Sequence, residues 1–126
     1  MADNYVMVEI GSRRRNQPAP PRVIFEALTQ PDRDPARPWL ILLPDEQRPR
    51  VVAARPPAEL TWSSLWPSRP GITIHFELPP DAGSGTDLRW TLHTDGPPPD
   101  PSALGHLRKR LNQLIKSRVP FVKIGI

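Results

Sequence analysis

The residues with the clearest capacity for chemistry are two histidines on strands that we expect to be neighbours. His75 lies in the alternating segment 72–78, and His93 lies in the alternating segment 87–94. Two imidazoles could act as a general base or bind a metal ion. The alternation, however, places both on the face that carries threonines and charges rather than on the apolar face. We therefore interpret them as solvent-facing residues, and we expect neither a metal site nor a catalytic role.

Two further patterns resemble functional motifs but have simpler explanations. Asp45 and Glu46 form an acidic pair in a proline-bounded loop, and adjacent carboxylates in such a loop are usually solvated. The segment 83–86 contains two glycines but lacks the lysine and the following helix of a phosphate-binding loop. It predicts a hairpin turn.

Four tryptophans are the residues that most favour a ligand site. Trp62, Trp66 and Trp90 share strand parity with aliphatic residues, so we expect them on the inner face of a sheet. Trp39 lies in the compact apolar segment 36–43. Indole rings supply a large apolar area and an N–H that needs an acceptor when it is buried. These rings predict either an ordinary core or the aromatic wall of a cavity.

The elements that must position these residues are delimited by 19 prolines, which end helices and central strands. Each proline-free segment has its own periodicity. The prolines at the start of residues 20–30 suit the first turn of a short helix, and Pro31 ends that helix. The expected elements are a strand over 5–10, short helices over 20–30 and 36–43, strands over 50–55, 60–66, 72–78 and 87–94, and a helix over 102–118.

The last helix has the strongest pattern in the chain. Asp100 or Ser102 can cap its first turn. One apolar stripe follows the helix, and the strands alternate on one side only, as in an antiparallel sheet with one buried face. We therefore predict a single α+β domain over residues 1–126, with about five antiparallel strands wrapped on the C-terminal helix. The stripe consists of Leu104, Leu107, Leu111, Leu114 and Ile115.

Composition excludes several classes of function. The chain has no cysteine, which rules out disulfides, thiolate nucleophiles and cysteine-based zinc sites. Its net charge is +4, but the arginines are spread along the chain without interleaved aromatics, so we expect no nucleic-acid partner. We find neither a signal-peptide pattern nor an apolar run of the roughly 20 residues that a membrane span needs, so we expect a cytoplasmic protein.

Three stretches in this order resemble the START-like or SRPBCC superfamily, which has the helix-grip fold. Residues 20–29, PPRVIFEALT, are similar to the segment of the family that leads from the first strand into the first helix. Residues 72–78 and 85–91 resemble its paired late strands, with Gly-Thr at the hairpin exit. Residues 104–115 stand where the gripping helix belongs. The closer resemblance is to the heat-shock-ATPase-activator-like and polyketide-cyclase-like branch, in a shortened form.

The resemblance implies an incurved sheet around the C-terminal helix, with a cavity between them that binds hydrophobic or amphipathic molecules. It supplies no catalytic residue, because the superfamily shares no catalytic set. The short segment between Trp39 and Trp62 implies that one or two middle strands are missing and that the cavity is smaller or more open. The residues expected to line it are Trp39, Trp62, Trp66, Phe76, Trp90, Leu107, Arg108, Leu111 and Leu114.

Arg108 is the charged member of this set. At the edge of the apolar stripe it could present a cation to an acidic ligand. A salt bridge to Glu59 or Glu77, or extension of the side chain into solvent, is the simpler interpretation.

These observations favour a small binding domain for an apolar or amphipathic molecule, with no cofactor and no evident catalysis. Two alternatives stay open. The first is an interaction protein with a filled core that forms a homodimer through its apolar tail, residues 119–126, or through the convex face of the sheet. The second is a cyclase- or hydratase-like enzyme acting in the same cavity, which would need an inward titratable group.

Overall fold

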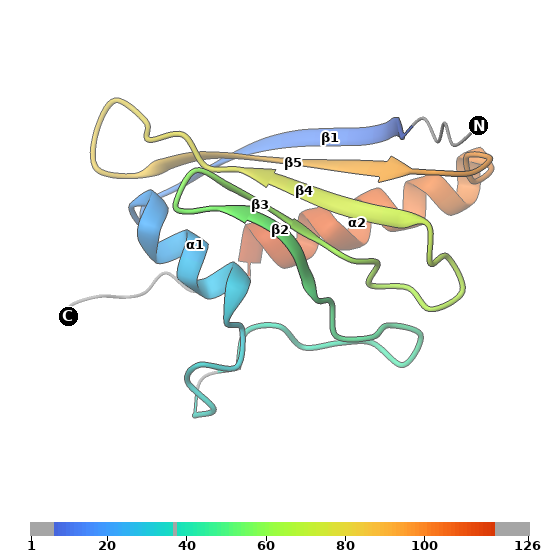
Figure 1. Ribbon diagram of the computed structural model, residues 1–126, viewed down its shortest axis with the longest axis horizontal. Coiled ribbons are helices and arrows are strands. Elements are labelled where there is room, and N and C mark those ends of the chain that lie inside the picture. The colour runs from blue at the N-terminus through green and yellow to red at the C-terminus, as the bar shows by residue number, and fades with distance from the viewer. Residues whose placement is uncertain (1–6, 37, 118–126) are drawn as a thin grey trace.

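Five antiparallel strands form one sheet, and both helices pack against the same face of it (Figure 1). The computed structural model describes residues 7–36 and 38–117. The order of strands across the sheet is β1-β5-β4-β3-β2. The predicted α+β class with about five strands and a C-terminal helix is confirmed. The elements are β1 Val8–Gln17, α1 Pro21–Thr29, β2 Val51–Arg55, β3 Glu59–Trp62, β4 Ile72–Glu77, β5 Thr86–Thr94 and α2 Pro101–Ser117.

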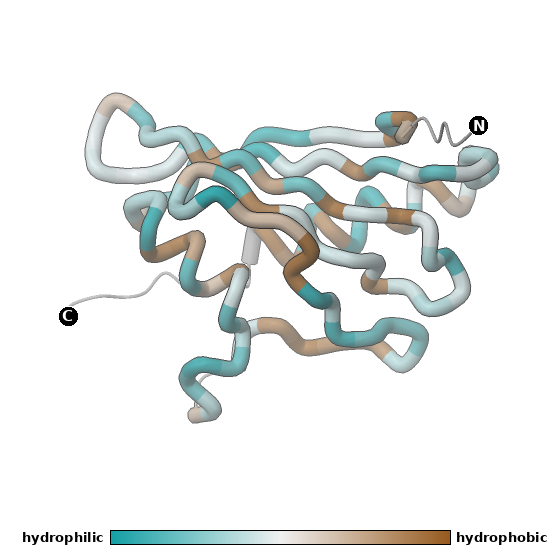
Figure 2. Tube along the Cα trace, viewed as in Figure 1, coloured by the Kyte–Doolittle hydropathy of each residue, from teal (hydrophilic) through white to brown (hydrophobic). Residues whose placement is uncertain are grey.

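The inner face of the sheet is made by the alternation that the sequence predicted. In β4 every second residue is a buried apolar side chain, and in β5 the same alternation holds from Leu88 to Leu92, with a buried threonine at each end of the strand. The residues between them point away from the helices. The hydrophobic positions recur along these strands and along one side of α2 (Figure 2). The central strands contribute Ile72, Ile74, Phe76, Leu88, Trp90 and Leu92 to the core.

Helix α1 is tied to the sheet through its last turn. Pro21 occupies its first turn, where a missing N–H costs nothing, and the helix ends at Thr29, before Pro31. The indole N–H of Trp62 on β3 donates to the carbonyl of Leu28 at 2.8 Å. The last carbonyls of a helix have no hydrogen-bond donor within the helix, so the Trp62 indole supplies the donor that the Leu28 carbonyl needs.

Helix α2 begins and packs as predicted. The side chain of Asp100 accepts the N–H of Ala103 at 2.8 Å, and its carbonyl accepts the N–H of Leu104 at 2.9 Å. Asp100 is therefore the N-cap, one of the two alternatives left open. Leu104 is half-buried, and the rest of the stripe is buried: Leu107, Leu111, Leu114 and Ile115.

The second short helix predicted over 36–43 is wrong. Residues 38–43 have irregular backbone, although Trp39 and Leu40 are buried. Their apolar character reflects packing on the core, since the Trp39 ring stacks on Trp62 with centroids 6.3 Å apart. A compact apolar run fits a buried loop as well as a short helix, and here the tertiary contacts decide.

The predicted strand over 60–66 is too long, because β3 ends at Trp62. The hydroxyl of Ser64 then accepts the N–H of Trp66 at 3.0 Å and lies 2.8 Å from the carbonyl of Arg69. Side-chain bonds of this kind compete with the strand ladder. Trp66 is buried, as expected, but from a loop rather than from the face of a strand.

The β4–β5 connection is the hairpin predicted over 83–86. One oxygen of Asp81 accepts the N–H groups of Gly83 at 2.8 Å and Gly85 at 3.0 Å, and the other accepts Asn16 of β1 at 2.8 Å. The Asn16 bond first, and then the backbone bonds, lower the pKa of Asp81 below its ordinary value. At Gly85 a Cβ atom would collide with the carbonyl oxygen of Gln17, so the turn requires glycine.

Candidate functional site

The residues predicted to line a cavity lie in the core layer between the sheet and its two helices, with one exception. Trp62, Phe76 and Trp90 face this layer from β3, β4 and β5. Arg108 is the exception, because it is exposed. Its aliphatic stem covers β1, where a Cβ on Gly11 would lie 3.0 Å from the Arg108 Cγ. The buried members of the predicted set are Trp39, Trp62, Trp66, Phe76, Trp90, Leu107, Leu111 and Leu114.

One side of the layer is a fixed aromatic wall with Trp62 at its centre. Trp39 stacks on Trp62 at an interplanar angle of 24°. Phe76 meets Trp62 edge to face, with centroids 4.9 Å apart and an angle of 74°. Both arrangements are favourable for aromatic pairs. The wall therefore joins β3, β4 and the segment before β2 without needing a ligand.

Two indole N–H groups in the core are left without a partner. Trp39 and Trp90 are 6% and 1% exposed, and neither Nε1 atom has a hydrogen-bond acceptor within the described part of the chain. A buried unpaired donor costs about 1–3 kcal/mol, so such a group requires an explanation. Trp90 lies directly opposite Phe76 on β4, within the inner face of the sheet. It is the polar group most central to the predicted site.

The β1 margin of the layer is basic. The register pairs Arg13 with Trp90 and Arg15 with Leu88, and directly paired residues share a face of the sheet. Arg15 Nε donates to Asn112 of α2 at 3.3 Å, and Arg13 is exposed. With the neighbouring Arg108, these arginines form a cationic edge. The run Arg13–Arg15 was visible in the sequence, but only the register assigns two of its members to this side.

The two histidines face away from the helices, as predicted. His75 Nε2 lies 2.9 Å from a carboxylate oxygen of Glu59, and its Nδ1 lies 2.8 Å from the hydroxyl of Thr61. His93 lies opposite Thr73. Both side chains are half-buried on the outer face of the sheet. The polar contacts of His75 are cross-strand contacts of ordinary type.

Replacement of both His75 and His93 with glutamine is expected to change the free energy of unfolding by about 1 kcal/mol or less, because a cross-strand pair contributes no more than that. Ligand binding in the sheet–helix layer should be unchanged, since neither side chain faces it. Urea denaturation and a fluorescence titration measure the two quantities. Loss of a bound metal ion or of an enzymatic activity in the double variant would contradict the surface interpretation.

The side chain of Glu46 is buried, although the sequence interpretation placed it in solvent, and that prediction is wrong. Its side chain is 1% exposed and makes a two-point ion pair with Arg110 of α2, with contacts of 2.7 and 2.9 Å. The N–H of Leu43 donates to Glu46 at 2.9 Å, and Arg110 donates to the carbonyl of Ile41 at 2.7 Å. No local signal in the sequence separates Glu46 from the adjacent, exposed Asp45.

Comparison with known proteins identifies the fold and no closer relationship. The sequence matches no protein-family model, and no curated protein matches it. Among solved structures, CalU16 from Micromonospora echinospora is similar with 20% identity, a TM-score of 0.64, and coverage of 86% of this chain and 70% of that one. The Aha1 dimer from Colwellia psychrerythraea has 19% identity, a TM-score of 0.63, and coverage of 89% and 92%.

A third similar structure is Ara h 8.0201, with 16% identity, a TM-score of 0.52, and coverage of 86% of this chain and 93% of that one. Likeness at such low identity shows the fold alone. That fold is the predicted helix-grip arrangement, an open antiparallel sheet packed on a C-terminal helix. Within residues 7–36 and 38–117, no helix is long and apolar enough to cross a membrane.

Proposed function

We propose that this protein is a small binding domain that holds an amphipathic molecule in the layer between the sheet and α2, without catalysis. The observation that carries the proposal is the unpartnered indole N–H of Trp90. An apolar core filled only by its own side chains gains nothing from a buried donor with no acceptor. A ligand carbonyl or ether oxygen at this position would supply the acceptor.

The basic margin supports the amphipathic character of the ligand. Arg13 and Arg108 are exposed beside the layer, at the edge formed by β1. A molecule whose apolar body lies against the aromatic wall would extend its polar end towards these arginines. A carboxylate is the group that guanidinium side chains bind best. Fatty acids and acidic polyketide-like aromatics have this combination of body and head group.

The expected affinity is micromolar or weaker, a binding free energy of about −8 kcal/mol or less favourable. The reason is that Trp62 and Phe76 already pack against each other and leave little apolar surface for a ligand. Titration with fatty acids, flavonoids and polyketide-like aromatics should change tryptophan emission. The variant Trp90→Phe keeps an aromatic ring but removes the N–H together with part of the indole. It should bind the best of these ligands about fivefold to tenfold more weakly, the loss of one hydrogen bond.

Trp62→Phe is the matched control, because its N–H already has an acceptor in Leu28. Both changes shrink a buried side chain and therefore cost stability. Trp62→Phe should lose about 1 kcal/mol more than Trp90→Phe, because it leaves the carbonyl of Leu28 unpaired whereas Trp90→Phe removes an unpaired donor. Absence of an emission change with every ligand, or equal affinity of wild type and Trp90→Phe, would count against the proposal.

A second proposal, that two copies form a homodimer through the apolar tail 119–126 or the convex sheet face, has support from the Aha1 structure, which is a dimer. The tail lies outside the described residues. The exposed Val51 and Val52 of edge strand β2 are a further apolar surface. A native mass spectrum of protein purified from its own host reports the oligomeric state and any retained ligand together.

A further inference from the structure

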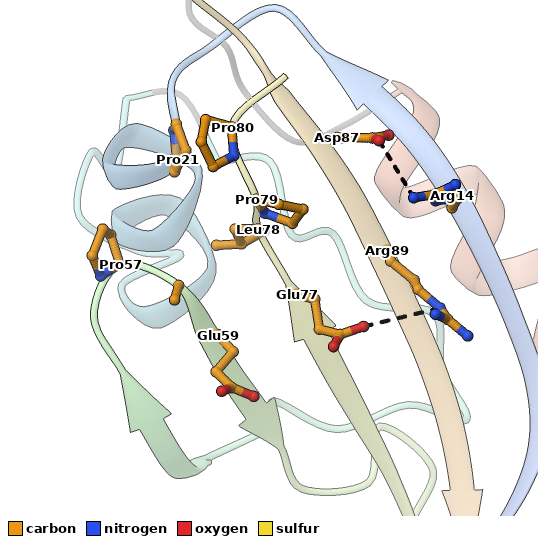
Figure 3. A pocket seen from close by; sticks show the side chains of 11 residues that line it. Arg14, Pro21, Pro57, Glu59, Glu77, Leu78, Pro79, Pro80, Asp87 and Arg89 are labelled. Carbon is orange, nitrogen blue, oxygen red and sulfur yellow. Dashed lines mark ion pairs between the residues drawn. The ribbon is translucent and has the colours of Figure 1, made fainter. Parts of the chain in front are cut away.

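A hollow on the outer face of the sheet is separate from the sheet–helix layer. It has a volume of about 570 Å³ and lies where the ends of the strands meet the start of α1 (Figure 3). Sites for small molecules are commonly of this size. Its charged side chains come from β1, β3, β4 and β5, and they alternate with the buried residues of those strands. They therefore face away from α2.

One wall of the hollow is apolar and made mainly of proline. Pro21 comes from the start of α1, Pro57 precedes β3, and Pro79 and Pro80 follow β4 (Figure 3). Proline has no N–H and only restricted backbone freedom. This wall therefore offers a rigid surface for an apolar group, and directional recognition must come from the charged side chains.

The floor of the hollow is a row of charges across four strands. The register pairs Arg14 with Arg89, Arg89 with Glu77, and Glu77 with Glu59. Two cations are thus direct neighbours, and two anions follow them. Like charges in direct opposition destabilise a sheet. An alternating order would have avoided both repulsions, so the row separates positive from negative charge at a cost in stability.

Three charges of this row, Arg14, Arg89 and Glu77, are only loosely paired. Arg14 lies 3.6 Å from Asp87, and Arg89 lies 3.9 Å from Glu77, and both separations exceed hydrogen-bond length. Arg89 Nε donates to the hydroxyl of Ser12 at 3.2 Å, which leaves its terminal N–H groups for a ligand. Glu59 is different, because it contacts Arg55 at 2.6 Å and His75 at 2.9 Å. Arg14, Arg89 and Glu77 therefore keep donors and acceptors that a ligand can use.

We propose that this hollow binds a short peptide with free termini. Arg14 and Arg89 take the carboxylate, Glu77 takes the ammonium group, and an apolar side chain lies on the proline wall. Strands are about 4.8 Å apart, so at the level of the backbone Glu77 lies about 7 Å from the midpoint between Arg14 and Arg89. The first and third Cα atoms of an extended tripeptide, two steps of roughly 3.3–3.6 Å, are separated by that distance.

The probe is the tripeptide Ala-Phe-Ala, compared with the same peptide acetylated at its amino end or amidated at its carboxyl end. Amide chemical shifts of the full-length protein locate the binding and give the dissociation constant. We expect the free peptide to bind on the order of 1 mM or tighter, with shifts at Arg14, Glu77 and Arg89. Each blocked form should bind about fivefold more weakly, the loss of one exposed ion pair.

Variants separate binding from stability. Glu77→Gln and Arg89→Gln should each weaken binding of the free peptide about fivefold, whereas the control changes Glu9→Gln and Lys109→Gln should leave it unchanged. Glu77→Gln should keep its thermal midpoint within about 2 °C of wild type or raise it, because it relieves the repulsion with Glu59. A purely structural row would instead lose stability in this variant.

Three results would overturn the proposal: blocked peptides that bind as tightly as the free one, shifts that map to the sheet–helix layer or are absent, and a midpoint of Glu77→Gln that falls well below wild type. The proposal does not rest on ligand binding in the sheet–helix layer. Trp90→Phe should therefore leave peptide binding unchanged, and Glu77→Gln should leave binding of the fatty acid unchanged.

Discussion

Replacement of Glu46 with alanine is expected to lower the free energy of unfolding by about 3–5 kcal/mol. The carboxylate is 1% exposed and accepts two contacts from Arg110 and one from the N–H of Leu43. Its removal leaves the guanidinium of Arg110, which is 15% exposed, without its anion. A charge that loses its partner in a poorly solvated place costs more than the pair itself contributes.

Urea denaturation measures this loss, and Asp45→Ala is the matched control. Asp45 is the adjacent carboxylate and is exposed, so its replacement should change stability by no more than about 0.5 kcal/mol. The double variant Glu46→Leu with Arg110→Met should recover much of the loss, because an apolar pair needs no compensation for buried charge. Equal effects of Glu46→Ala and Asp45→Ala would show that the ion pair is not buried in solution.

Leu111→Ala is expected to destabilise the protein by about 2–5 kcal/mol. Leu111 is completely buried on the stripe of α2 that faces the sheet. Removal of its side chain loses the transfer free energy and leaves a cavity in the middle of the core. Chemical denaturation measures the change.

Gln113→Ala, two residues later on the exposed side of the same helix, is the control and should be nearly neutral. A loss below about half a kcal/mol for Leu111→Ala would mean that α2 is not held by the sheet. Because the cavity lies in the proposed binding layer, the variant should also alter the affinity for apolar ligands if the fold is retained.

Local periodicity was sufficient to predict most elements of this fold. The alternation over 72–78 and 87–94 predicted β4 and β5, and it placed His75 and His93 on the outer face. The stripe from Leu104 to Ile115 predicted α2 and its buried side. These predictions succeed because strand and helix periods are properties of neighbouring residues, and a buried face leaves its period in the sequence.

The predictions failed where contacts between distant segments decide the structure. Residues 38–43 pack as a loop because Trp39 stacks on Trp62. The side chain of Glu46 is buried because it pairs at 2.7 Å with Arg110, a residue 64 positions further along the sequence. No local pattern distinguishes an apolar loop from a short helix, or a solvated carboxylate from a paired one.

The sequence by itself determined most of the elements and, within β4, β5 and α2, the face on which the side chains lie. Only the tertiary structure decided which faces meet and in which register. The row that joins Arg14, Arg89 and Glu77 exists because β1 pairs with β5, although these two strands lie at opposite ends of the described chain's sheet-forming sequence. The unpaired N–H of Trp90 is likewise a result of tertiary packing, because the segments that pack over β5 bury this group without offering it an acceptor. Periodicity is a local property, whereas register and the solvation of charge arise from contacts that form only when the whole chain has folded.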